Sequence, residues 1–334
     1  MTQDLFYHHP TNHHSPPLYI WIHFFSISCD LVFTARRMSK KAVVTCDKST
    51  NLDESLPLIS ILAASTTRKI PRPSTKKLAL FNYLLPSLIR TVDCGYRYEY
   101  VLGYDKGDPY YDSVEGMKEV ESWFADNIHV PMKEKGILIT FRKVKVNNTV
   151  KKPGPVFLEM ARAAYDAKAD YMYRVNDDTE FLTRWPAIFV KALADVPDSL
   201  AVVGPTCKQG NQKILTHDFV ARKHMEVFEM NYYPPELTDW WMDDWISFVY
   251  GKQRTFKAKA VRVIHHTGAH GQRYEVDRSH EGMLKKLLET GRKKVRQSLL
   301  KHKVSSNAMA IFDKDKYQAE SFRHNDVPTK PLEM

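Results

Sequence analysis

The chain has 334 residues, of which 43% are hydrophobic and 26% are charged, as in an ordinary soluble globular protein. Its formal net charge of +10 favours an anionic partner such as a nucleotide, a membrane surface or a nucleic acid, although part of that charge lies in the C-terminal tail. The cysteines show no paired spacing, so the sequence predicts neither a zinc site nor a disulfide framework; they are Cys29, Cys46, Cys94 and Cys207.

Residues 1–55 differ from the rest of the chain and are expected to lie outside the fold. Residues 1–17 are rich in histidine and other polar residues, which predicts disorder. The segment Leu18–Ala35 is apolar, but it contains a histidine and an aspartate, and a basic cluster follows it. That cluster is on the wrong side for an anchor that places a C-terminal domain in a lumen, so a tail is favoured over a weak membrane anchor. Residues 41–57 are expected to be a linker.

An alternation of strand and helix patterns begins at Leu58. Strands are predicted at Leu58–Ala64, Tyr98–Tyr104, Ile137–Val144 and Tyr171–Val175, with amphipathic helices between them. The first helix should be capped by Ser74 or Thr75 and kinked at Pro86. This order predicts an α/β fold of parallel strands joined by right-handed crossovers. The sequence contains neither a Gly-x-Gly-x-x-Gly nor a Gly-Lys-Ser/Thr loop, so a dinucleotide fold and a P-loop are not supported.

Polar residues follow the first two strands. The stretch Ser65–Lys69 suits the base and phosphates of a nucleotide, and an ordinary loop is the alternative. Asp105 can bond a ribose hydroxyl or a base, whereas Asp108 is more typical of a turn. After the third strand, Asn147-Asn148-Thr149 is an N-glycosylation sequon, which does not by itself establish a cellular compartment.

The fourth strand is an apolar run that stops at two adjacent carboxylates, Asp177 and Asp178. Two buried acids side by side repel each other and lose hydration, and a divalent cation removes that cost. Oxygen ligands of this kind suit Mg²⁺ or Mn²⁺, which can in turn hold a diphosphate. The alternative is a strand that simply ends in an Asn-Asp turn.

Two later segments also indicate a site. In Thr238–Trp245, Asp239 should cap a helix whose first turn contains Asp243 and Asp244, with three tryptophans around them. The acids can merely complement the helix dipole, but aromatic faces also stack on sugars, and an apolar surround raises a carboxylate pKa towards useful base strength.

The second segment, Val261–Gly271, contains His265, His266 and His270 at a strand end and in a glycine-rich turn. These histidines suggest a metal ligand, a phosphate contact or both. Further on, residues 285–303 predict a basic amphipathic helix. It is expected to be a solvated surface helix or a contact for anionic lipid or acceptor.

These pieces in this order resemble a GT-A type glycosyltransferase, a nucleotide-diphospho-sugar transferase, over roughly Leu58–Glu281. Asn176-Asp177-Asp178 takes the place of the DxD motif, with Asn in the first position. Trp241–Asp244 looks like the acidic motif after a Trp-rich loop, whose second acid is the general base in inverting members. His265 or His266 matches the late histidine metal ligand of the family.

The resemblance implies a Rossmann-like, mostly parallel mixed sheet over residues 56–281, followed by the basic helix and tail over residues 282–334. It implies Mn²⁺ or Mg²⁺ on Asp178 and His265 or His266, and a general base at Asp244 helped by Asp243. The nucleotide contacts that it implies are Thr66, Arg68, Asp105, Arg174 and Asp177.

The implied reaction moves a sugar from a nucleotide-diphosphate donor, expected to be a UDP-sugar, to a hydroxyl of a glycan or protein. Retention and inversion of configuration both stay open. A Golgi or secretory location follows from the resemblance alone, and a cytoplasmic one is the alternative. No nucleic-acid partner is expected. The rival hypothesis is a catalytically silent relative that binds a glycan or a protein partner, since the first Asp of the motif is missing.

Overall fold

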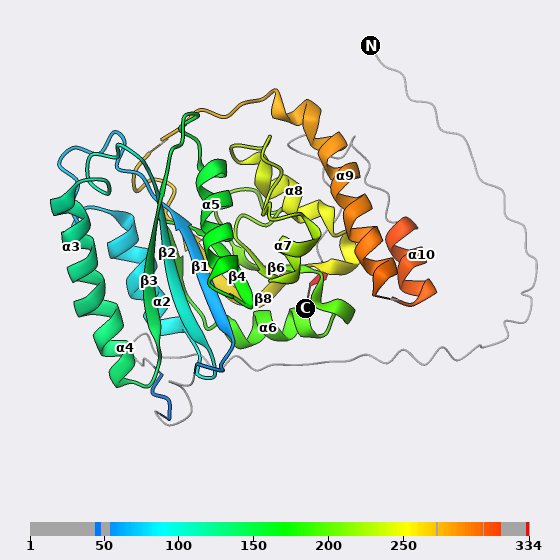
Figure 1. Cartoon of the computed structure of the whole chain (residues 1–334), viewed down its shortest axis with the longest axis horizontal. Coiled ribbons are helices and arrows are strands. Elements are labelled where there is room, and N and C mark those ends of the chain that lie inside the picture. Colours follow the sequence, from blue (N-terminus) through cyan, green and yellow to red (C-terminus); the bar gives the residue numbers. More distant parts are fainter. Residues whose placement is uncertain (1–43, 48–53, 272, 303, 315–331, 334) are drawn as a thin grey trace, which may run out of the picture. The chain divides into compact units, whose positions relative to one another are not determined.

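A computed structural model describes residues 44–47, 54–271, 273–302, 304–314 and 332–333 (Figure 1). The candidate anchor Leu18–Ala35 and most of the predicted linker lie outside these residues. No helix in the described part of the chain has the length and apolar character needed to cross a membrane.

A mixed sheet forms the centre of the fold. Its strands are β1 (Leu58–Ala64), β2 (Arg97–Asp105), β3 (Ile139–Val146), β4 (Tyr171–Asn176), β5 (Thr179–Phe181), β6 (Val202–Cys207), β7 (Asp218–Ala221), β8 (Thr255–His265) and β9 (Leu332–Glu333). The order is β3-β2-β1-β4-β7-β6-β8-β5, with β9 beside β8. The strands β1 to β4 run parallel, β8 is parallel to β6, and β7 and β5 are antiparallel to their neighbours. The predicted mixed, mostly parallel α/β fold is confirmed.

Helices cover both faces of this sheet. They are η1 (Leu80–Leu84), α2 (Leu85–Thr91), α3 (Val114–Phe124), η2 (Ala125–His129), α4 (Val130–Glu134), α5 (Pro153–Asp166), α6 (Pro186–Ala194), η3 (Pro197–Ser199), α7 (Lys223–Val227), α8 (Trp241–Val249), η4 (Lys252–Arg254), α9 (His280–Lys301) and α10 (Ser306–Lys314). Figure 1 shows α3 and α4 on one side of the sheet and α5, α8 and α9 on the other.

The core divides into two clusters because successive side chains of a strand point to opposite faces. In β4, Tyr173 and Val175 pack with α2, α3 and α6, whereas Met172 packs with α5, α8 and α9. The apolar run of the fourth strand is therefore buried on both sides, as central strands are in a sheet covered by helices on both faces. This burial holds the end of β4, with its acids, in a fixed place.

The start of the first helix differs from the prediction. The helical segment begins at Leu80, its N-cap residue Ala79 makes no side-chain capping bond, and α2 follows directly with Pro86 in its first turn. Thr75 Oγ1 instead donates to Glu119 Oε1 at 2.7 Å. The expected cap at Ser74 or Thr75 is wrong because a carboxylate on α3, remote in sequence, takes the hydroxyl.

The spacing of the cysteines indicates no disulfide, but the structure contains one. Cys46 and Cys94 are bonded, with their Cα atoms 5.7 Å apart and a sequence separation of 48. Cys46 is buried, and its backbone N–H donates to the Lys135 carbonyl at 2.8 Å. A spacing pattern could not reveal this pair, because pairing depends on how close folding brings the two Cα atoms. This part of the predicted linker is attached to the domain.

The predicted basic amphipathic helix is present as α9. Its buried stripe contains Leu284, Leu288, Val295 and Leu299, which pack in the cluster that holds the α8 tryptophans. Helices α9 and α8 approach each other closely at Gly291 of α9. A Cβ atom at that position would lie 2.6 Å from Cγ2 of Val249, at the end of α8. Several lysines lie on its exposed face, and their contact with lipid or acceptor stays a prediction.

Candidate active site

The loops that follow β1, β2 and β3 surround a cavity at the carboxyl edge of the sheet. Its volume is about 690 Å³, and it is lined by Thr66, Thr67, Arg68, Lys69, Ile70, Pro71, Asp105, Lys106, Gly107, Asp108, Pro109, Asn148 and Lys151. Small-molecule sites usually have volumes of about 300–1,000 Å³. Three of the predicted nucleotide contacts, Thr66, Arg68 and Asp105, therefore lie together at one cavity of suitable size.

Arg68 and Asp105 are held against each other in this cavity. Arg68 Nη2 donates to Asp105 Oδ2 at 2.8 Å, and Asn148 Nδ2 donates to Asp105 Oδ1 at 2.8 Å. Arg68 Nη1 also donates to the carbonyls of Lys151 and Arg273, at 2.9 and 3.1 Å. The loops after β1, β3 and β8 are thus tied together by one guanidinium.

The loop after β2 is organised by Asp108, which is almost completely buried. Its Oδ2 accepts from Thr66 Oγ1 and Thr67 N at 3.1 and 2.8 Å, and its Oδ1 accepts from Thr67 Oγ1 at 2.6 Å. The backbone N–H groups of Tyr110 and Tyr111 donate to the same Oδ1. Asp108 shapes the loops around the cavity, in keeping with the turn that was favoured for it.

The acidic motif lies beside this cavity, and its first aspartate is fully paired. Asp177 is 1% exposed. It accepts from Ser65 Oγ at 2.6 Å and from Arg273 Nη1 and Nη2 at 2.7 and 2.6 Å. Burial by itself would raise the pKa of Asp177, but the Arg273 charge and the hydrogen bonds from Arg273 and Ser65 outweigh it and hold the pKa below its ordinary value.

The second aspartate, Asp178, meets a histidine from β8. His265 Nε2 lies 2.9 Å from Asp178 Oδ1 and 3.3 Å from Asn176 Nδ2. The approach to Asp178 lacks hydrogen-bond geometry, and this buried oxygen accepts no hydrogen bond from any residue that the structure describes. Two potential metal ligands therefore converge, with the Asn176 amide next to them. Within the described residues, no three His, Cys, Asp or Glu side chains form a metal cluster.

The other two histidines of the segment have different partners. His266 Nε2 lies 2.9 Å from Glu180 Oε2, and its ring stacks on Tyr83 with centroids 3.9 Å apart. His270 Nε2 accepts from the Ala79 N–H at 2.9 Å. Neighbouring positions at the end of a strand face opposite ways, so only His265 meets Asp178. Of the two histidines predicted as ligands, the geometry favours His265.

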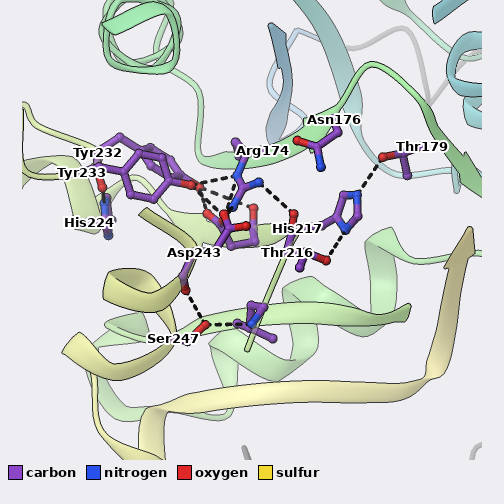
Figure 2. Close-up of polar contacts among 12 residues, drawn as sticks. Arg174, Asn176, Thr179, Thr216, His217, His224, Tyr232, Tyr233, Asp243 and Ser247 are labelled. Carbon is purple, nitrogen blue, oxygen red and sulfur yellow. Dashed lines mark hydrogen bonds and ion pairs between the residues drawn. The ribbon is translucent and has the colours of Figure 1, made fainter. Parts of the chain in front are cut away.

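Arg174 lies in β4, two residues before Asn176, and belongs to a buried polar network (Figure 2). It is 2% exposed, and its guanidinium donates to Asp218, Asp243, Tyr233 and the Thr216 carbonyl. Tyr232 and Tyr233 donate to Asp218 as well, both at 2.8 Å. These contacts connect β4 to β7 and α8. They suit a residue that positions α8, and its expected contact with nucleotide stays a prediction.

The two acids of α8 have contrasting surroundings. Asp243 is paired with Arg174, whereas Asp244 forms no ion pair with any residue that the structure describes. Burial, reinforced by the negative charge of Asp243, raises the pKa of Asp244 to about 8. The partly exposed Trp240 precedes the helix, with its ring 6.5 Å from that of Trp241. Asp244, a carboxylate with a raised pKa and no ion-pair partner within the described part of the chain, thus lies on a helix that follows the partly exposed Trp240.

The predicted cap of α8 at Asp239 is wrong. The N-cap residue is Trp240, which makes no side-chain capping bond. Asp239 is completely buried and accepts from Lys152 Nζ at 3.0 Å and from the Asp277 N–H at 2.8 Å, with His280 Nδ1 3.3 Å away. The carboxylate therefore joins the start of α5 to the start of α9 instead of capping its own helix.

Sequence reasoning missed Arg273 altogether. The only signal was a basic residue shortly after His270 in a glycine-rich segment, which does not indicate a partner. In the structure, its backbone carbonyl faces Arg68 and its guanidinium faces Asp177. Arg273 therefore connects the cavity to the acidic motif.

The strand order and the cavity at the carboxyl edge are consistent with the Rossmann-like, GT-A type fold that the sequence resemblance implies. No protein-family model and no curated protein matches the chain. Among solved structures, GalNAc-T7 with UDP, GalNAc and Mn²⁺ is 11% identical with a TM-score of 0.42, and the match covers 64% of this chain and 44% of that one. S. aureus TarS 1–349 in complex with UDP is 10% identical with a TM-score of 0.39, over 79% of this chain and 77% of that one.

Proposed function

We propose that the protein is a glycosyltransferase that moves a sugar from a nucleoside diphosphate donor to a hydroxyl of a glycan or protein acceptor, with the help of a divalent cation. The observation that carries the proposal is the position of Arg273. Its carbonyl lies 3.1 Å from Arg68 at the cavity, and its guanidinium lies 2.6 Å from Asp177 at the acidic motif. A nucleoside in the cavity would direct its diphosphate towards the motif past two arginines.

The cavity offers complementary groups for each part of such a donor. The Asp105 carboxylate and the Asn148 amide can bond ribose hydroxyls or base edges, and Thr66 contributes a hydroxyl at the same wall. Arg68 and Arg273 supply guanidinium groups beside the cavity, the kind of group that recognises phosphate oxygens. A UDP-sugar is the first donor to test, as the sequence resemblance implies.

Asp178 and His265 are the residues that would hold the cation. Among the described residues, no group donates a hydrogen bond to the buried Asp178 Oδ1, which lies 2.9 Å from an imidazole nitrogen, and this arrangement fits a metal ligand pair. Mn²⁺ and Mg²⁺ are commonly held by one or two protein groups, with waters and substrate phosphates completing the shell, so an incomplete protein cluster is compatible with this role. The bound cation would neutralise charge on the departing diphosphate.

Asp244 is the candidate general base. Its raised pKa of about 8 gives the carboxylate the strength to accept a proton from an acceptor hydroxyl as that oxygen attacks the anomeric carbon. Arg174, through Asp243, holds α8 in place, and the exposed Trp240 offers a face on which an acceptor sugar can stack. If configuration is retained, Asp244 would instead position the acceptor.

The deciding experiment is a screen of nucleotide sugars for metal-dependent release of nucleoside diphosphate, first with water and then with glycan and peptide acceptors. We expect one donor class to be turned over with Mn²⁺ or Mg²⁺ and not in excess chelator. Binding of a nucleotide sugar without release of diphosphate under any condition would favour the silent, glycan-binding alternative. Absence of both binding and release would reject the proposed function.

A further inference from the structure

The sequence contains a single N-glycosylation sequon, Asn147-Asn148-Thr149, and the structure places it immediately after β3. Asn147 and Thr149 are exposed, whereas Asn148 is half-buried. The Asn148 amide donates to Asp105 Oδ1 and to the Lys152 carbonyl, both at 2.8 Å. The middle residue of the sequon thus faces the domain, and the two residues that carry the modification signal face solvent.

A disulfide at the other end of the sheet indicates the kind of cellular compartment in which the chain folds. The disulfide between Cys46 and Cys94 lies before β2 begins at Arg97, whereas the sequon follows the end of the parallel neighbour β3. Disulfides of this structural kind persist in oxidising compartments and are rare where glutathione keeps thiols reduced. The disulfide and the sequon share no residues, so they are independent indications.

We infer that the chain matures in an oxidising compartment that also holds the machinery for N-glycosylation, and that Asn147 carries an N-linked glycan. In that step the Asn147 amide nitrogen forms a bond to the anomeric carbon of a lipid-diphosphate oligosaccharide. The bond from that carbon to the phosphate oxygen breaks, the lipid diphosphate leaves, and the amide loses one proton. In the same compartment the two thiols lose two electrons and two protons to a protein disulfide, which becomes a dithiol.

The position of Asn147 leaves the candidate active site open. Asn148 and Lys151 line the cavity, but Asn147 does not. The glycan would leave the molecule at the end of β3, which is the outermost strand on that side of the sheet. Bulky, hydrated groups at an edge strand hinder pairing with the edge of another molecule. A glycan here would therefore protect the sheet edge without closing the cavity.

The test expresses the full chain with a C-terminal tag in cultured eukaryotic cells and treats it with a glycosidase that releases N-linked glycans. We expect digestion to increase the gel mobility of the wild type and of Thr149→Ser, which keeps a sequon. Asn147→Gln and Thr149→Ala should show the digested mobility from the start. Mass spectrometry after enzymatic release in heavy-oxygen water should find labelled aspartate at position 147, and non-reducing peptide mapping should find Cys46 joined to Cys94.

A wild-type chain whose mobility and mass at Asn147 are unaffected by digestion would overturn the inference. A digestion shift that persists in Asn147→Gln would overturn the assignment to this residue. Because Asn147 is exposed, both sequon variants should keep the wild-type disulfide and thermal midpoint, so a missing glycan cannot be mistaken for misfolding. The readouts do not depend on transfer activity, so they stand or fall separately from the proposed function.

Discussion

Arg273 and Asp177 are joined by two charge-assisted hydrogen bonds, Nη1 to Oδ2 at 2.7 Å and Nη2 to Oδ1 at 2.6 Å, across 96 positions of sequence. The aspartate is almost completely buried, and the arginine is largely so. This pair holds the segment after β8 against the acidic motif at the end of β4. It suggests how the candidate donor site is kept in register before any ligand is bound.

Removing this arginine should destabilise the fold. Arg273→Ala leaves the Asp177 carboxylate buried with the Ser65 hydroxyl as its one remaining side-chain donor among the described residues, and breaking a buried pair in this way typically costs about 3–5 kcal/mol. Urea unfolding should detect the loss. Arg278→Ala is the matched control, because Arg278 is exposed on the same segment and should be nearly neutral. Equal stability of the two variants would contradict this role for the pair.

The same pair predicts a dependence on pH. The folded-state pKa of Asp177 is depressed, so its stabilising contribution is complete above the ordinary aspartate pKa of about 3.9. The contribution is lost as the pH falls through the lower, folded-state value. The stability difference between wild type and Arg273→Ala should therefore be constant near neutrality and shrink in acid. A difference that grows as the pH falls would contradict it.

Substitution of the neighbouring histidines His265 and His266 tests the proposed metal site. Asp178→Ala and His265→Ala should each weaken Mn²⁺ binding in the presence of nucleoside diphosphate at least about tenfold, as seen by the electron paramagnetic signal of free Mn²⁺. His266→Ala should bind nearly as well as the wild type, because its ring faces Glu180 and Tyr83. Equal losses for the two histidine variants would refute the choice of His265, and no loss in Asp178→Ala would refute the metal site.

Substitutions of Asp244 and of Asp243 should affect different properties: the first turnover, and the second mainly stability. Asp244→Asn keeps the size of the side chain and loses its basicity, and we expect turnover to fall at least about 100-fold, because general bases typically contribute about 10²- to 10⁴-fold. Asp243→Asn breaks the charge pair with Arg174, and should lower stability by about 1–3 kcal/mol with a smaller direct effect on chemistry. Near-normal turnover in Asp244→Asn would exclude it as the base. Large, equal losses at both positions would mean that the acids act as a unit.

A pH profile separates these roles further. With a pKa of about 8, Asp244 is mostly protonated at neutral pH, so kcat/KM should rise with pH through a midpoint near 8 and level off above it. The raised pKa also means that the folded state binds the extra proton between the ordinary aspartate pKa and 8, so stability falls as pH rises through that window. Asp244→Asn should therefore lose the rising limb of the rate and be more heat-stable than the wild type above pH 8. A variant that keeps the limb would contradict the assignment.

The disulfide should make a measurable contribution to stability. Closing a loop of 48 residues predicts about 4 kcal/mol from the reduced entropy of the unfolded chain. Replacing both Cys46 and Cys94 by Ala should lower the free energy of unfolding by an amount of this order, and a reducing agent should do the same to the wild type but not to the variant. Unfolding that is insensitive to the reducing agent would show that the bond does not form in solution.

Much of the fold could be predicted from the sequence because it depends on local periodicity. The apolar run that ends at Asp177 and Asp178 identified β4, and the alternation of strands and helices identified the parallel sheet. Since the carboxyl ends of parallel strands share one edge, the sequence pattern is enough to place Thr66 and Asp105 near each other, as they are in the cavity. The acids of α8 are conspicuous in the sequence because three tryptophans surround them in the first turn of a predicted helix.

Only the tertiary structure shows which buried side chains pair with each other. Arg273 meets Asp177, Arg174 meets Asp218 and Asp243, and Cys46 meets Cys94, each across a sequence separation over which side-chain periodicity carries no information. Asp239 illustrates the physical reason. By local rules its side chain should cap α8. A buried carboxylate, however, is stabilised far more by a cation and two donors than by one helix end. In the structure the Asp239 carboxylate therefore contacts Lys152, Asp277 and His280. Local pattern determines which elements form, and the requirement to pair buried charge determines which side chains meet.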